Sequence, residues 1–316
     1  MHQADLAETP PSRVCSALGR NKNMIKYIGI PTLLEIPSLE GTVDLCRDLG
    51  LSIIEVNMTR PEFLPKSLHK QKILDFASTQ GMEFTLHLPE EMDLGTFHDP
   101  IRDAWLDYLK NTIQWAYDSG IKLATMHLPN GIYYTLPDRK EWLYEKYKAE
   151  YLKRMISSFE TIFNRMPNGF QLCIENCGNF HLPFIKAVID NINIGLTWDV
   201  GHDAEADYCD KQYLESNSNK IHHVHLHDVS NGKAHKELFT GEIDIDSIIN
   251  FIVSNGIKAI VEVKTVDSLR KSISKLRDRF ARHQHQADYK CLKCGHESTS
   301  KIKCIYCGGQ ELEKVS

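Results

Sequence analysis

The sequence predicts an α/β protein, a (β/α)8 TIM barrel followed by a small four-cysteine zinc ribbon. The first observation is length, because 316 residues suit one large domain with a small appendage. The second is an alternation of short β-rich runs with longer helical stretches. The third is a group of four cysteines near the C-terminus. We expect a flexible tail at 1–23, the barrel at 24–283, and a linker with the ribbon at 284–316.

The barrel prediction rests on eight strand candidates, spread over about the length that this fold needs. A doubly wound open sheet is the alternative, but it usually has fewer strands and carries a Gly-rich phosphate loop, which is absent here. Helical spacing is clearest at 99–120 and from Asp138 to Met166, where Pro167 stops the pattern. The expected strands are 24–30, 52–58, 83–88, 122–128, 170–176, 194–200, 221–228 and 259–263.

Composition narrows the class of protein. The net charge of −5 produces no overall field that would attract nucleic acid, although a local basic groove is compatible with it. No apolar run is long enough to span a membrane, and the N-terminal segment lacks the apolar core of a secretory signal. We therefore expect a cytoplasmic protein with reduced thiols, and Met24 is an alternative start.

Metal-ligand side chains recur at the ends of six consecutive predicted strands. In a barrel of this type, functional groups lie at the C-terminal ends of the strands and face inward. A single histidine or carboxylate at such a place is usually structural, but six repetitions favour a divalent metal site. The six residues are His87, His127, Glu175, Asp199, His225 and Glu262, with His202 just beyond the fourth.

The segment KIHHVHLHDVSNGKAH concentrates five of the fifteen histidines. Side chains alternate along a strand, so His223, His225 and His227 share one face. We expect His223 to lie too deep for the site and His225 to be the ligand. His227 and Asp228 are candidates for the mouth of the barrel, and His235 in the following loop is expected to reach back over it.

The C-terminal cysteines have the spacing of a structural zinc site. Cys291 and Cys294 form one pair, Cys304 and Cys307 form the second, and nine residues separate the pairs. Four thiolates at this spacing hold Zn²⁺ tetrahedrally, and a module this short needs the metal to fold. A redox pair or free thiols are the alternatives. Nearby lysines make the module locally basic, which mildly favours an anionic partner.

These strand-end motifs resemble the xylose-isomerase-like barrel superfamily over roughly residues 24–280. The motifs are HLP, MHLPNG, IEN, WDVGH, HLHD and VEV. The sugar isomerase and epimerase branch implies one divalent metal (Mn²⁺, Mg²⁺, Co²⁺ or Zn²⁺) held by Glu175, Asp199, His225 and Glu262. Glu175 and Glu262 would exchange a proton with the carbon beside a carbonyl, through an enediolate. His202 would bind substrate hydroxyls.

The same superfamily contains the endonuclease-IV type of apurinic endonuclease, which implies more metals. His87, His127 and Glu175 would then hold an additional zinc. A third zinc would use His202, His235 and an aspartate, but Lys233 occupies the aspartate position, which puts this site in doubt unless Asp203 or Asp228 replaces it. Two metals would suit hydrolysis of a phosphate ester or of abasic DNA.

The sequence therefore favours a sugar or sugar-phosphate isomerase or epimerase. A metal-dependent phosphodiesterase is the alternative enzyme, and a barrel that only binds a ligand is the third reading. The substrate, the number of barrel metals and the oligomeric state, including a homo-oligomer, stay open. A tyrosine-rich stretch at 133–151 could line the mouth or simply pack at helical spacing.

Overall fold

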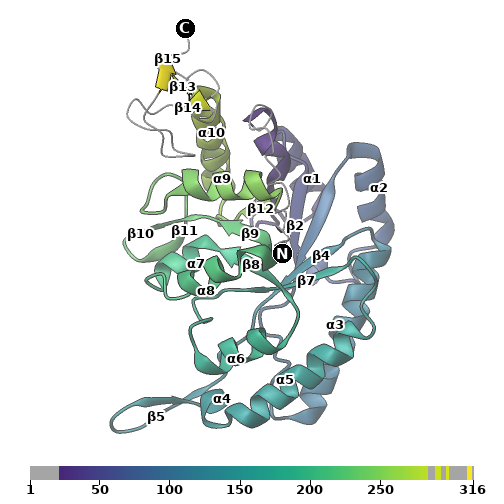
Figure 1. Cartoon of the computed structure of the whole chain (residues 1–316). Helices are drawn as coiled ribbons and strands as arrows, with labels where there is room; N and C mark the ends of the chain where they lie inside the picture. Colours follow the sequence, from purple (N-terminus) through teal and green to yellow (C-terminus); the bar gives the residue numbers. More distant parts are fainter. Residues whose placement is uncertain (1–20, 284–288, 293–296, 299–311, 315–316) are drawn as a thin grey trace, which may run out of the picture. The chain divides into compact units, whose positions relative to one another are not determined.

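Eight parallel strands close into a barrel in the computed structural model, which describes residues 21–283, 289–292, 297–298 and 312–314. The strand order around the barrel is β1-β12-β9-β8-β7-β4-β3-β2, so strands adjacent along the chain are also neighbours in space (Figure 1). This closure confirms the predicted TIM barrel and excludes the open sheet. The barrel strands are β1 (Ile28–Pro31), β2 (Ile53–Asn57), β3 (Glu83–His87), β4 (Leu123–Met126), β7 (Gln171–Glu175), β8 (Gly195–Asp199), β9 (Ile221–Leu226) and β12 (Lys258–Val261).

Helices cover the outer face of the strands (Figure 1). In α3, the buried positions Leu106, Leu109, Ile113 and Ala116 follow helical spacing, which gives the helix one apolar face. Helix α5 packs between α3 and α6. The helices are α1 (Leu39–Asp48), α2 (Lys70–Gln80), α3 (Asp99–Asp118), α4 (Leu143–Lys146), α5 (Lys148–Phe163), α6 (Pro183–Asn191), α7 (Val200–Glu205), α8 (Lys211–Ser216), α9 (Ile245–Asn255) and α10 (Val266–His283).

The interior of the barrel contains polar side chains below the strand ends. Along β2, Ile53, Ile54 and Val56 are fully buried, as expected for a strand covered on both faces. The buried hydroxyls of Thr125 and Thr197 lie 2.8 Å apart, which joins β4 to β8 across the interior. These two threonines precede His127 and Asp199 by two residues, so the alternation of side chains along a strand places them on the same inward face, one layer below the strand ends.

Two elements differ from the sequence-based expectation. The stretch from Asp138 to Met166 is not one helix, because β5 (Tyr133–Thr135) and β6 (Lys140–Trp142) pair as a hairpin before α4 begins. Pro137 lies in the connection between the two strands, just before the stretch predicted to be helical. The first strand also starts later than expected, because residues Asn21–Tyr27 form a 3-10 helix and pairing with β12 begins at Ile28.

The described C-terminal residues form a small sheet of their own. Strands β13 (Tyr289–Cys291), β14 (Glu297–Ser298) and β15 (Leu312–Lys314) pair antiparallel in the order β14-β13-β15. Cys294, Cys304 and Cys307 lie outside the described residues, so the zinc ribbon stays a prediction. The predicted tail also lies outside them up to residue 20. Among the helices that the structure describes, none has the length and apolar character to cross a membrane.

Candidate metal centre

Four side chains from four consecutive barrel strands converge at the C-terminal ends of those strands. Glu175 ends β7, Asp199 ends β8, His225 lies on β9, and Glu262 follows β12. Each offers one ligand atom, and these atoms all lie within 4.8 Å of one another. The structure thus brings together the four residues that the sequence analysis selected for the main metal site.

His225 stands at the centre of this group. Its Nδ1 atom lies 3.2 Å from Oε1 of Glu175, 3.1 Å from Oε2 of Glu262 and 3.9 Å from Oδ2 of Asp199. Glu175, Asp199 and His225 are at most 1% exposed, whereas the Glu262 side chain is 16% exposed and pairs with Lys264 at 2.7 Å. The group is therefore buried on one side and open to the mouth near Glu262.

A second ligand group shares Glu175 with the first. Oε2 of Glu175 lies 3.2 Å from Nε2 of His87 and 3.2 Å from Nε2 of His127. The rings of His87 and His127 meet edge to face with centroids 4.8 Å apart. Nδ1 of His87 contacts the carbonyl oxygen of Leu88 at 2.9 Å, which places its proton there and leaves Nε2 free to bind a cation. Glu175 can consequently bridge two cations.

The carboxylates and imidazoles of the site shift one another's pKa values. Burial raises the pKa of Glu175, but His225 and His127 outweigh it and hold that pKa well below its usual range. Burial likewise opposes a charged His87, yet Glu175 raises the pKa of His87 to about 9. The carboxylates thus demand positive charge nearby. A divalent cation can supply that charge in place of the protons, and the donor set of imidazole and carboxylate fits such a cation.

Local backbone contacts fix the position of Asp199. Its N–H donates to Oδ1 of Asn176 at 2.7 Å, and the Asn176 side-chain amide donates to the carbonyl oxygen of Asp199 at 2.9 Å. Oδ1 of Asp199 also accepts the N–H of His202 at 2.6 Å and caps α7. The IEN and WDVGH motifs therefore lock β7 to β8 and orient one site carboxylate.

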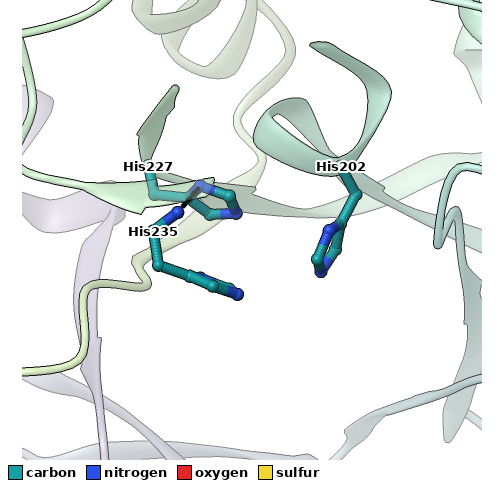
Figure 2. A group of neighbouring side chains, drawn as sticks. All are labelled: His202, His227 and His235. Atoms are coloured by element: carbon teal, nitrogen blue, oxygen red, sulfur yellow. Dashed lines mark hydrogen bonds between the residues drawn. The ribbon is translucent and has the colours of Figure 1, made fainter. Parts of the chain in front are cut away.

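Three histidines form a third group beside the main one. Figure 2 shows His227 and His235 close together, with His202 facing them from the other side. The His235 N–H donates to Nδ1 of His227 at 2.9 Å, so the His227 proton resides on Nε2, 3.0 Å from the Asp199 carboxylate. His235 Nδ1 contacts the carbonyl oxygen of Glu262 at 3.0 Å. Nε2 of His235 is therefore available to a ligand, whereas His227 supports Asp199.

The aspartates considered for the doubtful third site lie elsewhere. Asp228 is fully buried, and its carboxylate accepts four backbone N–H groups, those of Val229, Thr240, Gly241 and Ile243. Asp203 is buried, and it interacts with Trp198 and Asp210. Neither aspartate belongs to the described group of His202 and His235, in which His227 is the third member. Lys233 lies exposed on β11 (Lys233–Lys236), which pairs with β10 (Asp228–Ser230).

Gly201 is required where α7 approaches His227. A Cβ atom on Gly201 would lie 1.8 Å from Cε1 of His227, far inside contact distance. Gly201→Ala is therefore expected to displace the His227 ring from Asp199 and to destabilise the fold by about 1–3 kcal/mol, the usual range for overpacking. Thermal unfolding and metal affinity of the variant check this. Gly232→Ala is the control for a glycine replacement, because nothing lies within 4 Å of the added Cβ; its φ of +66° can cost backbone stability, but the metal affinity should not change. Equal effects of the two substitutions would contradict it.

The tyrosine-rich stretch divides into packing residues and exposed ones. Tyr144 and Tyr151 are buried and stack with ring centroids 4.2 Å apart, and Tyr144 donates a hydrogen bond to Asp93. Tyr133, Tyr134 and Tyr147 are exposed. The pattern thus serves packing at two positions, and three rings remain at the surface.

One buried site residue escaped the sequence analysis. Glu55 on β2 is 2% exposed and contacts both His223 and His225. It occupies the middle of the run SIIEVNM, two residues before the strand end, so a search of strand ends passes over it. The available signal was a single charged residue within an otherwise apolar strand.

Comparison with known proteins places the barrel in a family. The sequence profile described as xylose isomerase-like TIM barrel matches residues 43–282. An uncharacterized protein of Methanocaldococcus jannaschii is 26% identical over 217 residues, which make up 64% of this chain and 77% of that relative.

Solved structures share the fold at lower identity. A D-tagatose 3-epimerase-like protein has a TM-score of 0.66 and 19% identity, covering 82% of this chain and 98% of that protein. An L-ribulose 3-epimerase has a TM-score of 0.62 and 17% identity, covering 82% and 97%. The IOLI protein, crystallised with a zinc atom, has a TM-score of 0.61 and 14% identity, covering 81% and 98%. These similarities establish the architecture.

Proposed function

Because this chain belongs to the xylose isomerase-like TIM barrel family, we propose that it is a metal-dependent isomerase or epimerase of a sugar or sugar phosphate. The observation that carries the proposal is the pair Glu175 and Glu262, whose carboxylates both lie within 3.2 Å of Nδ1 of His225. Two similar solved structures are described as a sugar epimerase and an epimerase-like protein, which supports this choice of reaction.

Glu175, Asp199, His225 and Glu262 would hold the cation. When bound, a divalent cation polarises a carbonyl group and a neighbouring hydroxyl of the substrate. Imidazole and carboxylate ligands suit Zn²⁺ and Mn²⁺, and carboxylates also suit Mg²⁺. A cation at this place would offset the negative charge of the carboxylates around His225, which is why these ligands fit a divalent cation.

The two glutamates would carry the proton transfers. One removes the proton from the carbon beside the carbonyl, and the other returns a proton to an adjacent or opposite position. Burial opposes their ionisation, but His225 outweighs it and holds the pKa of both glutamates well below its usual range, so both are carboxylates before the substrate binds. His202, whose side chain is 26% exposed, and Nε2 of His235 would hold the substrate hydroxyls at the mouth.

The group of His87, His127 and Glu175 favours a second candidate function. A second cation there would share Glu175 with the first, and paired cations clamp the attacking and leaving oxygens of a phosphate ester. The competing activity is therefore that of a metal-dependent phosphodiesterase. No contact within the described residues assigns it a nucleic-acid substrate.

Deuterium incorporation tests the proposed reaction directly. Aldoses, ketoses and their phosphates are incubated with the protein in D2O, and NMR follows exchange of the hydrogen beside the carbonyl. Metal content is counted on the Cys304→Ser/Cys307→Ser variant, which excludes zinc bound by the C-terminal cysteines. About one cation per chain with exchange into a sugar supports the proposal. Two or three zinc ions, no exchange and cleavage of a phosphodiester would replace it with the second candidate.

Removal of the barrel metal is expected to destabilise the protein. Without the cation, the buried carboxylates of Glu175 and Asp199 lose a positive neighbour. Metal present at a hundred times its dissociation constant should stabilise the fold by about 2.7 kcal/mol. Thermal unfolding of the Cys304→Ser/Cys307→Ser variant at increasing metal concentration measures this. A melting temperature that does not depend on metal would argue against a cation in the barrel.

The four C-terminal cysteines would bind a separate structural zinc ion. Their spacing supports this proposal. The Cys304→Ser/Cys307→Ser variant should then contain one zinc ion fewer than the unmodified chain while its barrel metal is unchanged. Equal metal content in the two proteins would refute the zinc ribbon.

A further inference from the structure

Glu55 is a buried charge in the middle of an apolar strand. Its neighbours on β2, Ile53, Ile54 and Val56, are fully buried, and Glu55 itself is 2% exposed. A carboxylate in such surroundings is costly unless partners compensate it, and an apolar side chain would pack there more cheaply. Its presence therefore calls for a role other than filling the core.

The two histidine partners of Glu55 come from a strand that β2 does not pair with. In the barrel order, β1 and β12 separate β2 from β9, so the carboxylate reaches across the interior. Oε2 of Glu55 lies 2.9 Å from Nε2 of His223 in a hydrogen bond, and it accepts the Thr85 hydroxyl at 3.3 Å. Oε1 lies 3.0 Å from Nε2 of His225, at ion-pair distance but outside the direction of a hydrogen bond.

This placement gives the two ring nitrogens of His225 different surroundings. Nε2 faces Glu55, and Nδ1 faces Glu175, Asp199 and Glu262. A neutral imidazole carries one proton. With a cation among the three carboxylates at Nδ1, a proton is disfavoured on that atom, and the Glu55 carboxylate favours the tautomer with the proton on Nε2. The Nδ1 lone pair is then directed at the position where the cation would be held. A carboxylate behind a metal-bound histidine commonly fixes its tautomer and ring orientation in this way.

We propose that Glu55, anchored by His223, is the positioning residue of the metal centre and directs Nδ1 of His225 toward the bound cation. This role rests on the metal site of the proposed function. In this arrangement, His223 holds the second carboxylate oxygen of Glu55, so that Glu55 cannot turn away from His225. Neither Glu55 nor His223 is expected to touch substrate, because both lie behind His225, fully or almost fully buried.

The test is metal affinity of Glu55→Gln, measured by titrating metal-free protein with Zn²⁺ and with Co²⁺ in the Cys304→Ser/Cys307→Ser background. Glutamine keeps the shape of the side chain, but its amide can donate to Nε2 and thereby favour a proton on Nδ1. We expect unchanged stoichiometry, affinity reduced by about 10–100-fold, and a shifted Co²⁺ absorption spectrum. Glu55→Asp should recover part of the affinity because it keeps the charge.

Glu83→Gln is the matched control, since Glu83 belongs to the neighbouring strand β3 but is exposed and pairs with Lys258. It should leave affinity and spectrum unchanged. A Glu55→Gln protein with a lower melting temperature but unaltered affinity and Co²⁺ spectrum would mean that Glu55 is only structural. If the unmodified barrel binds no cation at all, the metal centre itself is refuted, which separates failure of the proposed function from failure of this role.

If the Glu55→Gln protein does not fold, NMR of the protein with Glu55 unchanged tests the proposal instead. Histidine nitrogens are labelled, the protein is loaded with ¹¹³Cd²⁺, and the His225 signals are assigned through their backbone connectivities. Cadmium coupling to Nδ1 together with a proton on Nε2 is the expected result. Coupling to Nε2 would overturn the proposal.

Discussion

Replacing Glu175 with glutamine is expected to remove the barrel cation and to reduce turnover by a factor of about 10²–10⁴. Glu175 is the one residue common to both ligand groups, which lie at the ends of β3, β4, β7, β8, β9 and β12. It lies 3.2 Å from each of His87, His127 and His225 and is 1% exposed. Loss of its charge affects metal binding and proton transfer together, because one carboxylate serves both.

The fold of Glu175→Gln should nevertheless persist. The side chain keeps its size, and the histidines around it can become neutral once the carboxylate charge is gone. Metal content, turnover and circular dichroism of the variant are compared with those of Glu83→Gln, which changes an exposed glutamate of the barrel. A Glu175→Gln protein that keeps every measurable function would favour the reading of this barrel as a binding module.

The largest loss of stability is expected from Asp228→Asn. Each oxygen of the fully buried Asp228 carboxylate accepts two backbone N–H groups, those of Val229 and Ile243 on Oδ1 and those of Thr240 and Gly241 on Oδ2. Asparagine replaces one oxygen with an amide that donates, so two N–H groups lose their acceptor. At about 1–3 kcal/mol for each, the free energy of unfolding should fall by about 2–6 kcal/mol.

Chemical denaturation of Asp228→Asn measures this loss, with Asp44→Asn as the control because Asp44 is exposed on α1. The metal affinity of the folded variant should change far less than its stability, since Asp228 contacts backbone rather than the ligand groups. A loss below about 0.5 kcal/mol, the range of ordinary surface substitutions, would contradict the count of hydrogen bonds.

The sequence revealed the residues that follow the rule for parallel barrels and missed those that do not. Asp199 and Glu175 stand at strand ends, where position alone suggests function. Glu55 stands inside a strand, and its partners on β9 depend on which side chains meet across the interior, which no local pattern encodes. Period two placed His227 on the face of His225 but could not show that its ring nitrogens serve His235 and Asp199.

The missed hairpin has a similar cause. Residues 138–166 carry tyrosines and leucines at helical spacing, yet Lys140–Trp142 form β6, which pairs with the preceding strand β5. Pairing between two strands that are separated by a short connection competes with the local preference for a helix. Which of the two structures forms depends on what the segment packs against. The closed barrel itself was predictable, because eight apolar runs with helical connections leave few other arrangements.

Asp199 contacts both the first turn of α7 and the ligand group, so this turn should report whether a cation is bound. One oxygen of this carboxylate holds the N–H of His202, and the other faces the ligand group. A cation bound to this carboxylate would withdraw electron density from it and weaken its hydrogen bond to the His202 N–H. Amide hydrogen exchange at His202 should therefore differ between the metal-free and the loaded protein, while exchange at the start of α9, which Asp244 caps away from the ligand groups, stays constant.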